Sequence, residues 1–176
     1  MIYDNFQFTI PEGLDIRVIT NTDAKNEADD QFCIVQTLLS PRFDNRGIIA
    51  AHYGKLKTPD SMEESYKEVI KILDLMEFDR NLAYKGAPEA MPDEFTPVPS
   101  PGAQLIIDEA MKDDDRPLFI TFLGPLTDLA SAYLIEPRIA KRLTCIWIGG
   151  NTYPVGGSEY NLSNDIHAAN VVFKSE

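Results

Sequence analysis

Short apolar runs alternate along this chain with stretches whose apolar residues recur at helical spacing. Four runs have the continuously apolar, β-branched character of strands covered on both faces, at residues 17–20, 47–51, 117–122 and 144–148. Helical spacing marks residues 29–39, 61–76, 102–111, 126–135 and 165–173, with a shorter helical piece at 139–143. Because crossovers join strands that alternate with helices, the strands run parallel. The sequence therefore predicts an α/β fold in one domain over residues 1–176, with a mainly parallel sheet and helices on both faces.

Local signals indicate where several elements begin and end. Ser61 followed by Glu64 forms a capping box, which predicts the start of a helix. Residues 84–101 hold five prolines, which favour an extended surface connection over a packed element. The charged run at residues 112–116 is typical of a solvated helix end and turn.

The charge and the cysteines limit the classes of partner and compartment. Acidic residues outnumber basic ones by 28 to 16, so the formal net charge is −12. Such a charge repels nucleic-acid backbones and anionic lipid, and neither is an expected partner. No stretch approaches the roughly 18 apolar residues of a membrane span, and residues 1–20 lack the pattern of a signal peptide. Cys33 and Cys145 lie in apolar runs, where reduced thiols are the usual state, so we expect a cytoplasmic protein.

Functional residues of a parallel sheet gather in the loops that follow the carboxyl ends of its strands. Here these loops are residues 21–30, 123–128 and 149–165. The first loop holds four acids at the start of a helix: Asp23, Glu27, Asp29 and Asp30. Carboxylates at that place can cap the helix and interact favourably with its dipole. Four of them together can also bind a hard cation such as calcium or magnesium, and the residues alone leave both interpretations open.

The other two loops combine sharp turns with a pair of polar side chains. The Gly124–Pro125 pair turns the chain directly after a strand and could direct a backbone carbonyl toward a bound ion. The Gly149–Gly150 pair would let the backbone approach a ligand. Glu159 and Asn161 lie two residues apart, so in an extended loop they could share the hydroxyls of a sugar. An ordinary surface loop that binds no ligand is also consistent with the spacing of Glu159 and Asn161.

Taken together, the three loops resemble the inosine-uridine preferring nucleoside hydrolase family. That family opens with a strand and D-x-D-x-G-x-D-D, to which residues 21–30 are similar. Residues 124–130 are similar to its G-[GP]-L-T-N-[IL]-A segment. Residues 148–150 and 159–165 resemble its M-G-G and E-F-N-x-x-x-D-P elements. The order and spacing of the motifs agree over residues 17–173, which implies a nucleoside hydrolase-like fold with a Rossmann-like core.

The resemblance also implies an activity and a set of roles. The activity is calcium-dependent hydrolysis of the N-glycosidic bond of ribonucleosides or related ribosyl compounds, so the partner is a small nucleoside or ribosyl substrate. Calcium would be bound by Asp23, Asp30 and the main-chain carbonyl of Leu123. Asp23 would also take a proton from water as the catalytic base. The remaining matches are substrate-binding positions around the ribose, at Asp29, Ile148, Glu159 and Asn161.

The chain departs from the family's pattern in its first two loops. Asn21 stands where the family has its first aspartate, the Pro-Gly of the loop is missing, and two extra residues separate Asp23 from Asp29. The family's asparagine after the second strand has no clear match. His52 lies in that region, either as a substitute ribose contact or as an ordinary histidine at a strand end.

Length is the largest departure, because family chains are much longer and complete their site with a late histidine and aspartate. We therefore expect residues 1–176 to be an N-terminal portion, incomplete at its C-terminus, with a natural short form that has an unfinished metal shell as the alternative. In both cases we expect the chain to be inactive alone. Apolar surface left open at the sheet would favour a homo-oligomer. His167 lies on the last predicted helix and is expected to be a structural or surface residue.

Two other functions compete with hydrolysis. One is a non-catalytic module of the same fold that binds a sugar or nucleoside. The other is a phosphoryl-transfer enzyme that uses Asp23 as a metal ligand. The second is disfavoured because Asn21 occupies the place of the nucleophilic aspartate and the net charge is unfavourable for phosphate esters.

Overall fold

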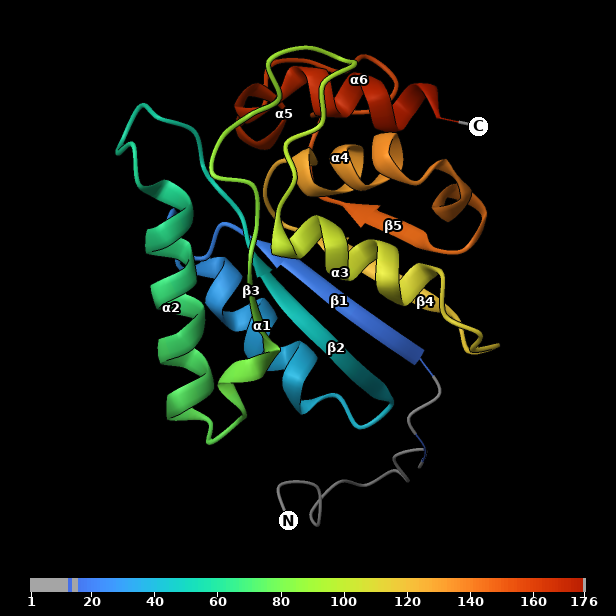
Figure 1. Cartoon of the computed structure of the whole chain (residues 1–176). Coiled ribbons are helices and arrows are strands. Elements are labelled where there is room, and N and C mark those ends of the chain that lie inside the picture. The colour runs from blue at the N-terminus through green and yellow to red at the C-terminus, as the bar shows by residue number, and fades with distance from the viewer. Residues whose placement is uncertain (1–12, 14–15, 176) are drawn as a thin grey trace.

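The computed structural model describes residue 13 and residues 16–175, and its centre is a parallel sheet (Figure 1). Five strands lie in the order β3-β2-β1-β4-β5, and every neighbouring pair is parallel. Their bounds are β1 Ile16–Thr22, β2 Phe43–Ala50, β3 Ala83–Lys85, β4 Leu118–Phe122 and β5 Thr144–Trp147. The predicted α/β class with a parallel sheet is confirmed. The predicted absence of a signal peptide concerns a segment that lies mostly outside the described residues.

Helices cover both faces of the sheet, as the sequence predicts. The first face carries α1 (Asp29–Leu39) and α2 (Ser61–Leu75), which pack with β2 into one apolar cluster. The other face carries α3 (Pro101–Ala110), α4 (Thr127–Ile135) and α6 (Ile166–Lys174), which form a second cluster with β1 and β4. The remaining elements are the helix α5 (Tyr160–Asn164) and two 3-10 helices, η1 (Arg80–Leu82) and η2 (Pro137–Lys141). No described helix is long and apolar enough to cross a membrane.

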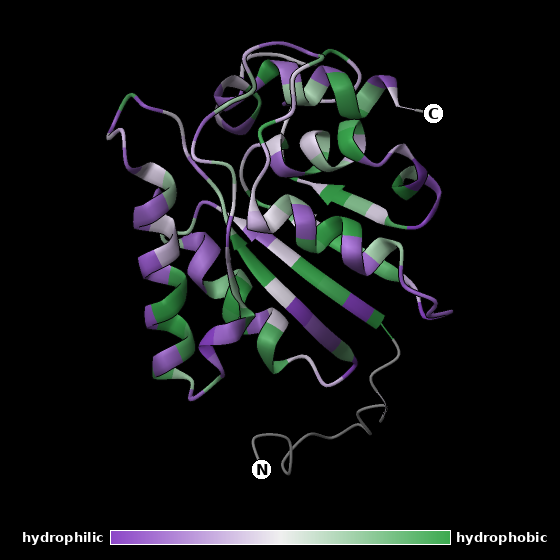
Figure 2. Ribbon diagram, in the orientation of Figure 1, coloured by the Kyte–Doolittle hydropathy of each residue, from purple (hydrophilic) through white to green (hydrophobic). Residues whose placement is uncertain are grey.

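Backbone pairing continues past the strand ends and brings three loops together at the carboxyl edge of the sheet. The Leu123 N–H donates to the Asn21 carbonyl at 2.9 Å, and the Ile148 N–H donates to the Phe122 carbonyl at 3.1 Å. The loops after β1, β4 and β5 therefore start next to one another. Figure 2 shows that β2 is hydrophilic near its start and apolar toward its carboxyl end, whereas β1 is apolar in its middle and ends in the polar residues Thr20, Asn21 and Thr22.

Three predictions about individual elements are wrong. The segment expected to be an unpacked connection, residues 84–101, begins inside the short strand β3, and its Ala87 and Met91 are buried. The strand β2 begins at Phe43, before the apolar run, because its polar first residues pair with β1. The strand β5 is not covered on both faces, since Ile146 is 52% exposed.

The predicted capping box does not form at the start of α2. The N-cap is Asp60, which makes no side-chain capping bond. The Ser61 hydroxyl instead accepts the Tyr53 N–H at 3.3 Å, and Glu64 accepts the Tyr53 hydroxyl. A tertiary contact with the segment after β2 has therefore replaced the local one.

The charged run at residues 112–116 is more than a solvated turn. The Arg116 and Asp114 carbonyls accept hydrogen bonds from the buried Arg17 guanidinium at 3.0 and 3.4 Å. Arg116 also pairs with Asp44 of β2 at 2.9 Å. The run therefore fixes the amino-terminal ends of β1 and β2 as well as ending α3.

Candidate active site

One pocket at the carboxyl edge of the sheet brings together all seven residues that the sequence singled out. Its volume is about 220 Å³. These seven residues are Asp23, Asp29, Asp30, Leu123, Ile148, Glu159 and Asn161. They come from the loop after β1, the start of α1, the loop after β4 and the segment between β5 and α5. The geometry gives their proximity, and their roles remain proposals.

Asp23 and Asp30 form a buried pair of carboxyl groups in this pocket. Asp23 is 3% exposed, and its Oδ2 atom has no hydrogen-bond partner among the described residues. The Thr22 hydroxyl donates to Asp30 Oδ2 at 2.6 Å. Burial, followed by the charge of Asp30, raises the pKa of Asp23 to about 8. Burial also raises the pKa of Asp30, so the pair favours a bound proton or a cation.

The turn after β4 lies directly against this pair. A Cβ atom on Gly124 would lie 3.3 Å from Cβ and Cγ of Asp23, so a glycine allows this close approach. The neighbouring Leu123 carbonyl accepts a hydrogen bond from the Asn161 side-chain amide at 2.8 Å. The same amide nitrogen donates to the Ile148 carbonyl at 3.0 Å. Asn161 thus joins the loops after β4 and β5.

Glu159 holds the third loop together. As the N-cap of α5, its carboxylate accepts the N–H groups of Asn161 at 2.9 Å and Leu162 at 3.0 Å. It also accepts the Gly150 N–H at 3.2 Å. A carboxylate has about four lone-pair sites, so this one retains about one for a ligand.

The Gly149–Gly150 pair packs against Trp147 and turns the chain. A Cβ atom on Gly149 would lie 2.2 Å from the Trp147 ring, and Gly150 has φ +79°. The pair therefore lets the chain pack over an indole and turn.

The pocket is also lined by Glu27, the fourth acid of the predicted first loop, and by three residues that the sequence analysis did not assign to a site, Asn26, Cys33 and Tyr160. Asn26 and Tyr160 also contact Lys57, whose Nζ lies 2.5 Å from Asn26 Oδ1 and 5.4 Å from the Tyr160 ring centroid. Tyr160 lies between the predicted residues Glu159 and Asn161, and Asn26 lies within the predicted first loop, so their positions in the sequence could have indicated both. Lys57 comes from the segment after β2, and no motif marks it.

His52 lies outside this pocket, in a buried chain of hydrogen bonds. Its Nδ1 accepts the Gly54 N–H at 3.2 Å, so its Nε2 carries the proton and donates to the Thr127 hydroxyl at 2.9 Å. That hydroxyl donates to Asp165 at 2.7 Å. Burial lowers the pKa of His52 to about 4. These contacts favour the ordinary strand-end histidine over a ribose contact, and His167 is exposed on α6.

The acid pair fits a hard cation, although the protein side chains supply few ligands. Within the described residues, no three His, Cys, Asp or Glu side chains are grouped to hold a metal. The available donors are the carboxylates of Asp23 and Asp30 and the Leu123 carbonyl, which keeps a second lone pair beside its bond to Asn161. All are oxygens, as calcium and magnesium prefer. The unpartnered, buried Asp23 Oδ2 is the observation that favours a cation here.

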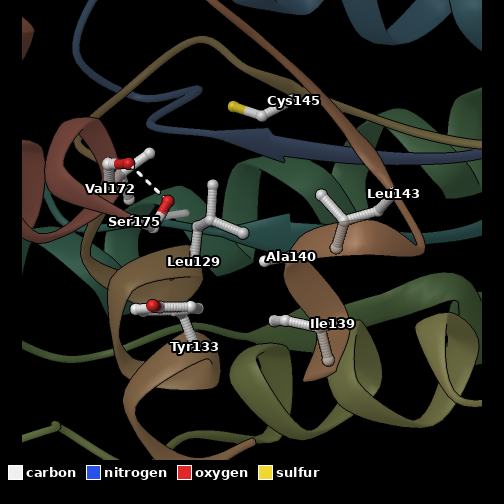
Figure 3. A pocket seen from close by; sticks show the side chains of 8 residues that line it. All are labelled: Leu129, Tyr133, Ile139, Ala140, Leu143, Cys145, Val172 and Ser175. Carbon is white, nitrogen blue, oxygen red and sulfur yellow. Dashed lines mark hydrogen bonds between the residues drawn. The ribbon is translucent and has the colours of Figure 1, made fainter. Parts of the chain in front are cut away.

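An apolar cavity between α4, η2, β5 and α6 is a poor alternative site (Figure 3). It has a volume of about 210 Å³, and its lining includes Leu129, Ile139 and Val172. Cys145 also lines it, and burial raises the pKa of this thiol to about 11. The thiol is therefore protonated at neutral pH and is a weak nucleophile. Both cysteines are free, as the sequence predicts.

Comparison with known proteins places this chain among nucleoside hydrolases. The family model for inosine-uridine preferring nucleoside hydrolases matches residues 18–176. A hydrolase of that name from Leishmania major is 35% identical over 74 residues, which are 40% of this chain and 24% of the relative. A probable uridine nucleosidase from Arabidopsis thaliana is 31% identical over 87 residues, 47% of this chain and 27% of that protein.

The fold is also similar to solved structures. The purine-preferring ribonucleoside hydrolase from Gardnerella vaginalis superposes with a TM-score of 0.74 at 24% identity. The superposition covers 90% of this chain and 58% of that structure. A plant nucleoside hydrolase gives 0.72 at 22% identity, with 92% and 57% covered. The chain thus spans little more than half the length of these structures, and the alignments with the curated relatives span about a quarter of theirs.

Proposed function

Because this chain belongs to the inosine-uridine preferring nucleoside hydrolase family, we propose that it hydrolyses the N-glycosidic bond of ribonucleosides or related ribosyl compounds. Water supplies a hydroxyl group to the sugar carbon, and the departing base takes the bonding electrons and a proton. The observation that carries the proposal is the single pocket that holds both the acid pair and the Glu159–Asn161 segment.

Asp23 is the catalytic base of the proposed reaction. Its unpartnered Oδ2 atom is the oxygen that receives the proton of the attacking water. A base acts best when its pKa is near the working pH, and burial beside Asp30 moves the pKa of Asp23 in that direction. The approach of Gly124 limits the freedom of this side chain, which helps to position it.

Calcium is the proposed cofactor. Asp23, Asp30 and the Leu123 carbonyl would hold it, since these are the hard oxygen donors of the pocket. When bound, the ion would supply positive charge that lowers the pKa of water and neutralises the acid pair. Thr22 keeps the Asp30 carboxylate oriented through its hydroxyl.

The ribose is proposed to bind across the mouth of the pocket. Asp29 is exposed there, and Asn161 Oδ1 and the remaining lone pair of Glu159 can accept sugar hydroxyls. Ile148 is 62% exposed and offers an apolar surface to the sugar ring. Held in this way, the sugar is oriented for attack, which is a major source of rate acceleration.

Turnover of inosine, uridine and nitrophenyl riboside in calcium tests the proposal. Asp23→Asn removes the base and should lower kcat by about 100-fold or more. Asp113→Asn is the matched control, because it removes one exposed carboxylate outside the pocket. Each protein is assayed both as residues 1–176 and as any longer natural form of the chain. Equal activity of wild type and Asp23→Asn would contradict the assigned base, and no turnover of any substrate by either length of the wild type would contradict the hydrolase.

Ribose binding without turnover is the second candidate function. It is favoured by the contact of Asn161 with the Leu123 carbonyl, which engages a proposed metal ligand with a protein donor. Calorimetry with ribose and inosine distinguishes the two functions, since a binding module gives saturable heat and no free base.

A further inference from the structure

A basic pocket lies at the amino-terminal ends of the strands, at the opposite edge of the sheet from the candidate active site. Its volume is about 310 Å³. Two acidic residues, Asp114 and Asp115, line it together with five basic ones, Arg17, Lys112, Arg116, Lys141 and Arg142. Basic residues therefore outnumber acidic ones in this pocket, whereas the whole chain has 28 acidic and 16 basic residues.

One of the basic residues that line the pocket, Arg17, is buried and is held by several hydrogen bonds. Arg17 is 3% exposed, and its guanidinium donates to the carbonyls of Glu109 at 2.7 Å and Arg116 at 3.0 Å. It also lies 3.5 Å from a carboxylate oxygen of Glu109. These bonds hold the turn after α3 against the start of β1.

Three charged residues of the pocket lining form no ion pair with a described residue: the cations Lys141 and Arg142 and the carboxylate of Asp115. These unpaired groups therefore carry a net charge of +1. Arg116 pairs with Asp44 and Asp114, and Lys112 pairs with Glu109. Among residues 16–175, by contrast, no carboxylate forms an ion pair with Lys141 or Arg142. Both side chains are exposed where η2 leads into β5, facing the turn of residues 112–117 across the pocket.

We propose that this pocket binds a small phosphoryl anion of the pyrophosphate or phosphate-ester class, with Lys141 and Arg142 as its principal cations. The planar guanidinium of arginine matches phosphate oxygens in pairs, and lysine adds a mobile point charge. The volume lies at the lower end of the range for small-molecule sites, about 300 Å³.

A small anion reaches this pocket where a nucleic acid does not. Salt screens charges beyond about 8 Å at physiological ionic strength, so the rest of the acidic surface acts weakly on a compact ligand. An extended polyanion would cover much more of a surface with net charge −12. The pocket and the candidate active site share no lining residue, so this proposal is independent of the hydrolase activity.

Calorimetric titration with pyrophosphate, in buffer without divalent cations, tests the proposal. We expect saturable binding at one site that weakens between low and moderate salt. The double variant Lys141→Ala/Arg142→Ala should bind at least tenfold more weakly. Arg138→Ala is the matched control: it removes a charge from the same 3-10 helix, but Arg138 pairs with Glu136 and does not line the pocket.

Each alternative outcome is informative. An absence of saturable heat with wild type, or an equal loss in Arg138→Ala, would overturn the site. Equal affinity for citrate would overturn the phosphoryl class. Amide NMR shifts of the wild-type protein provide a readout that needs no variant: pyrophosphate should shift the amides of residues 112–116 and 141–144, and shifts confined to residues 21–30 would contradict the location.

Discussion

The side-chain amide of Asn21 donates a hydrogen bond of 2.9 Å to Oδ2 of Asp128, and solvent reaches neither side chain. Asp128 Oδ1 also accepts the Ala87 N–H at 2.8 Å and the Ser100 hydroxyl at 2.6 Å. The pattern that the chain resembles has aspartate at the first of these positions and asparagine at the second. The carboxyl group has therefore moved across one hydrogen bond, which accounts for the departure at Asn21.

We expect the protein to tolerate the exchange of Asn21 and Asp128 in the double variant. We expect each single change to destabilise it. Asn21→Asp places two carboxyl groups in contact without solvent and should lower the free energy of unfolding by about 3 kcal/mol or more. Asp128→Asn leaves the Ala87 and Ser100 donors with a weaker acceptor. The double variant Asn21→Asp/Asp128→Asn should recover most of the loss in urea denaturation. Additive losses would show that the two positions are not coupled.

Calcium should stabilise the folded protein through the Asp23–Asp30 pair. A ligand that binds the native state raises its stability by about 2.7 kcal/mol at a hundred times its Kd. We expect millimolar calcium to raise the Tm of wild type, and Asp30→Asn to abolish the rise. Asp113→Asn should respond like wild type, because its carboxylate lies outside the pocket. A wild-type Tm that saturating calcium leaves unchanged would count against the cation site.

His52 should make stability fall in mild acid. Its pKa is lowered to about 4 in the folded state, against an ordinary value of 6.5, so between these pH values the unfolded chain binds more protons. The contribution is fully present above pH 6.5 and is lost as the pH falls toward 4, by about 3 kcal/mol in all. His52→Gln should reduce the slope of unfolding free energy against pH in this window. His167→Gln is the control and should keep the wild-type slope, because His167 is exposed.

Most of the fold could be predicted because its signals are local. The helix α1 is found at the predicted residues, since its apolar spacing and the Ser40–Pro41 ending are both in the sequence. The strand β3 has three residues and no apolar run, so only its pairing with β2 defines it. The same limit applies to Ser61, whose hydroxyl accepts a bond from Tyr53 in place of the predicted cap.

For the candidate site, too, the location of the residues could be predicted from the sequence, but their contacts could not. Its residues could be placed at one edge, because the strands are parallel and the acids follow β1 directly. The contacts of Asn161 with the Leu123 and Ile148 carbonyls could not be predicted, since they depend on how two loops meet. Lys57 illustrates the same limit, because it reaches the pocket rim from a loop that carries no motif.

Glu159 is expected to order the third loop even without substrate. Its carboxylate accepts the N–H groups of Gly150, Asn161 and Leu162, and loss of a helix cap costs about 1 kcal/mol. Glu159→Ala should therefore speed hydrogen exchange of these amides by about tenfold, and leave the exchange of the buried strand β1 unchanged. Ser158→Ala is the neighbouring control, since only its backbone carbonyl accepts a hydrogen bond in this loop. Unchanged exchange at Gly150 and Leu162 in Glu159→Ala would show that the loop is ordered by other contacts, and would leave the carboxylate free for the sugar.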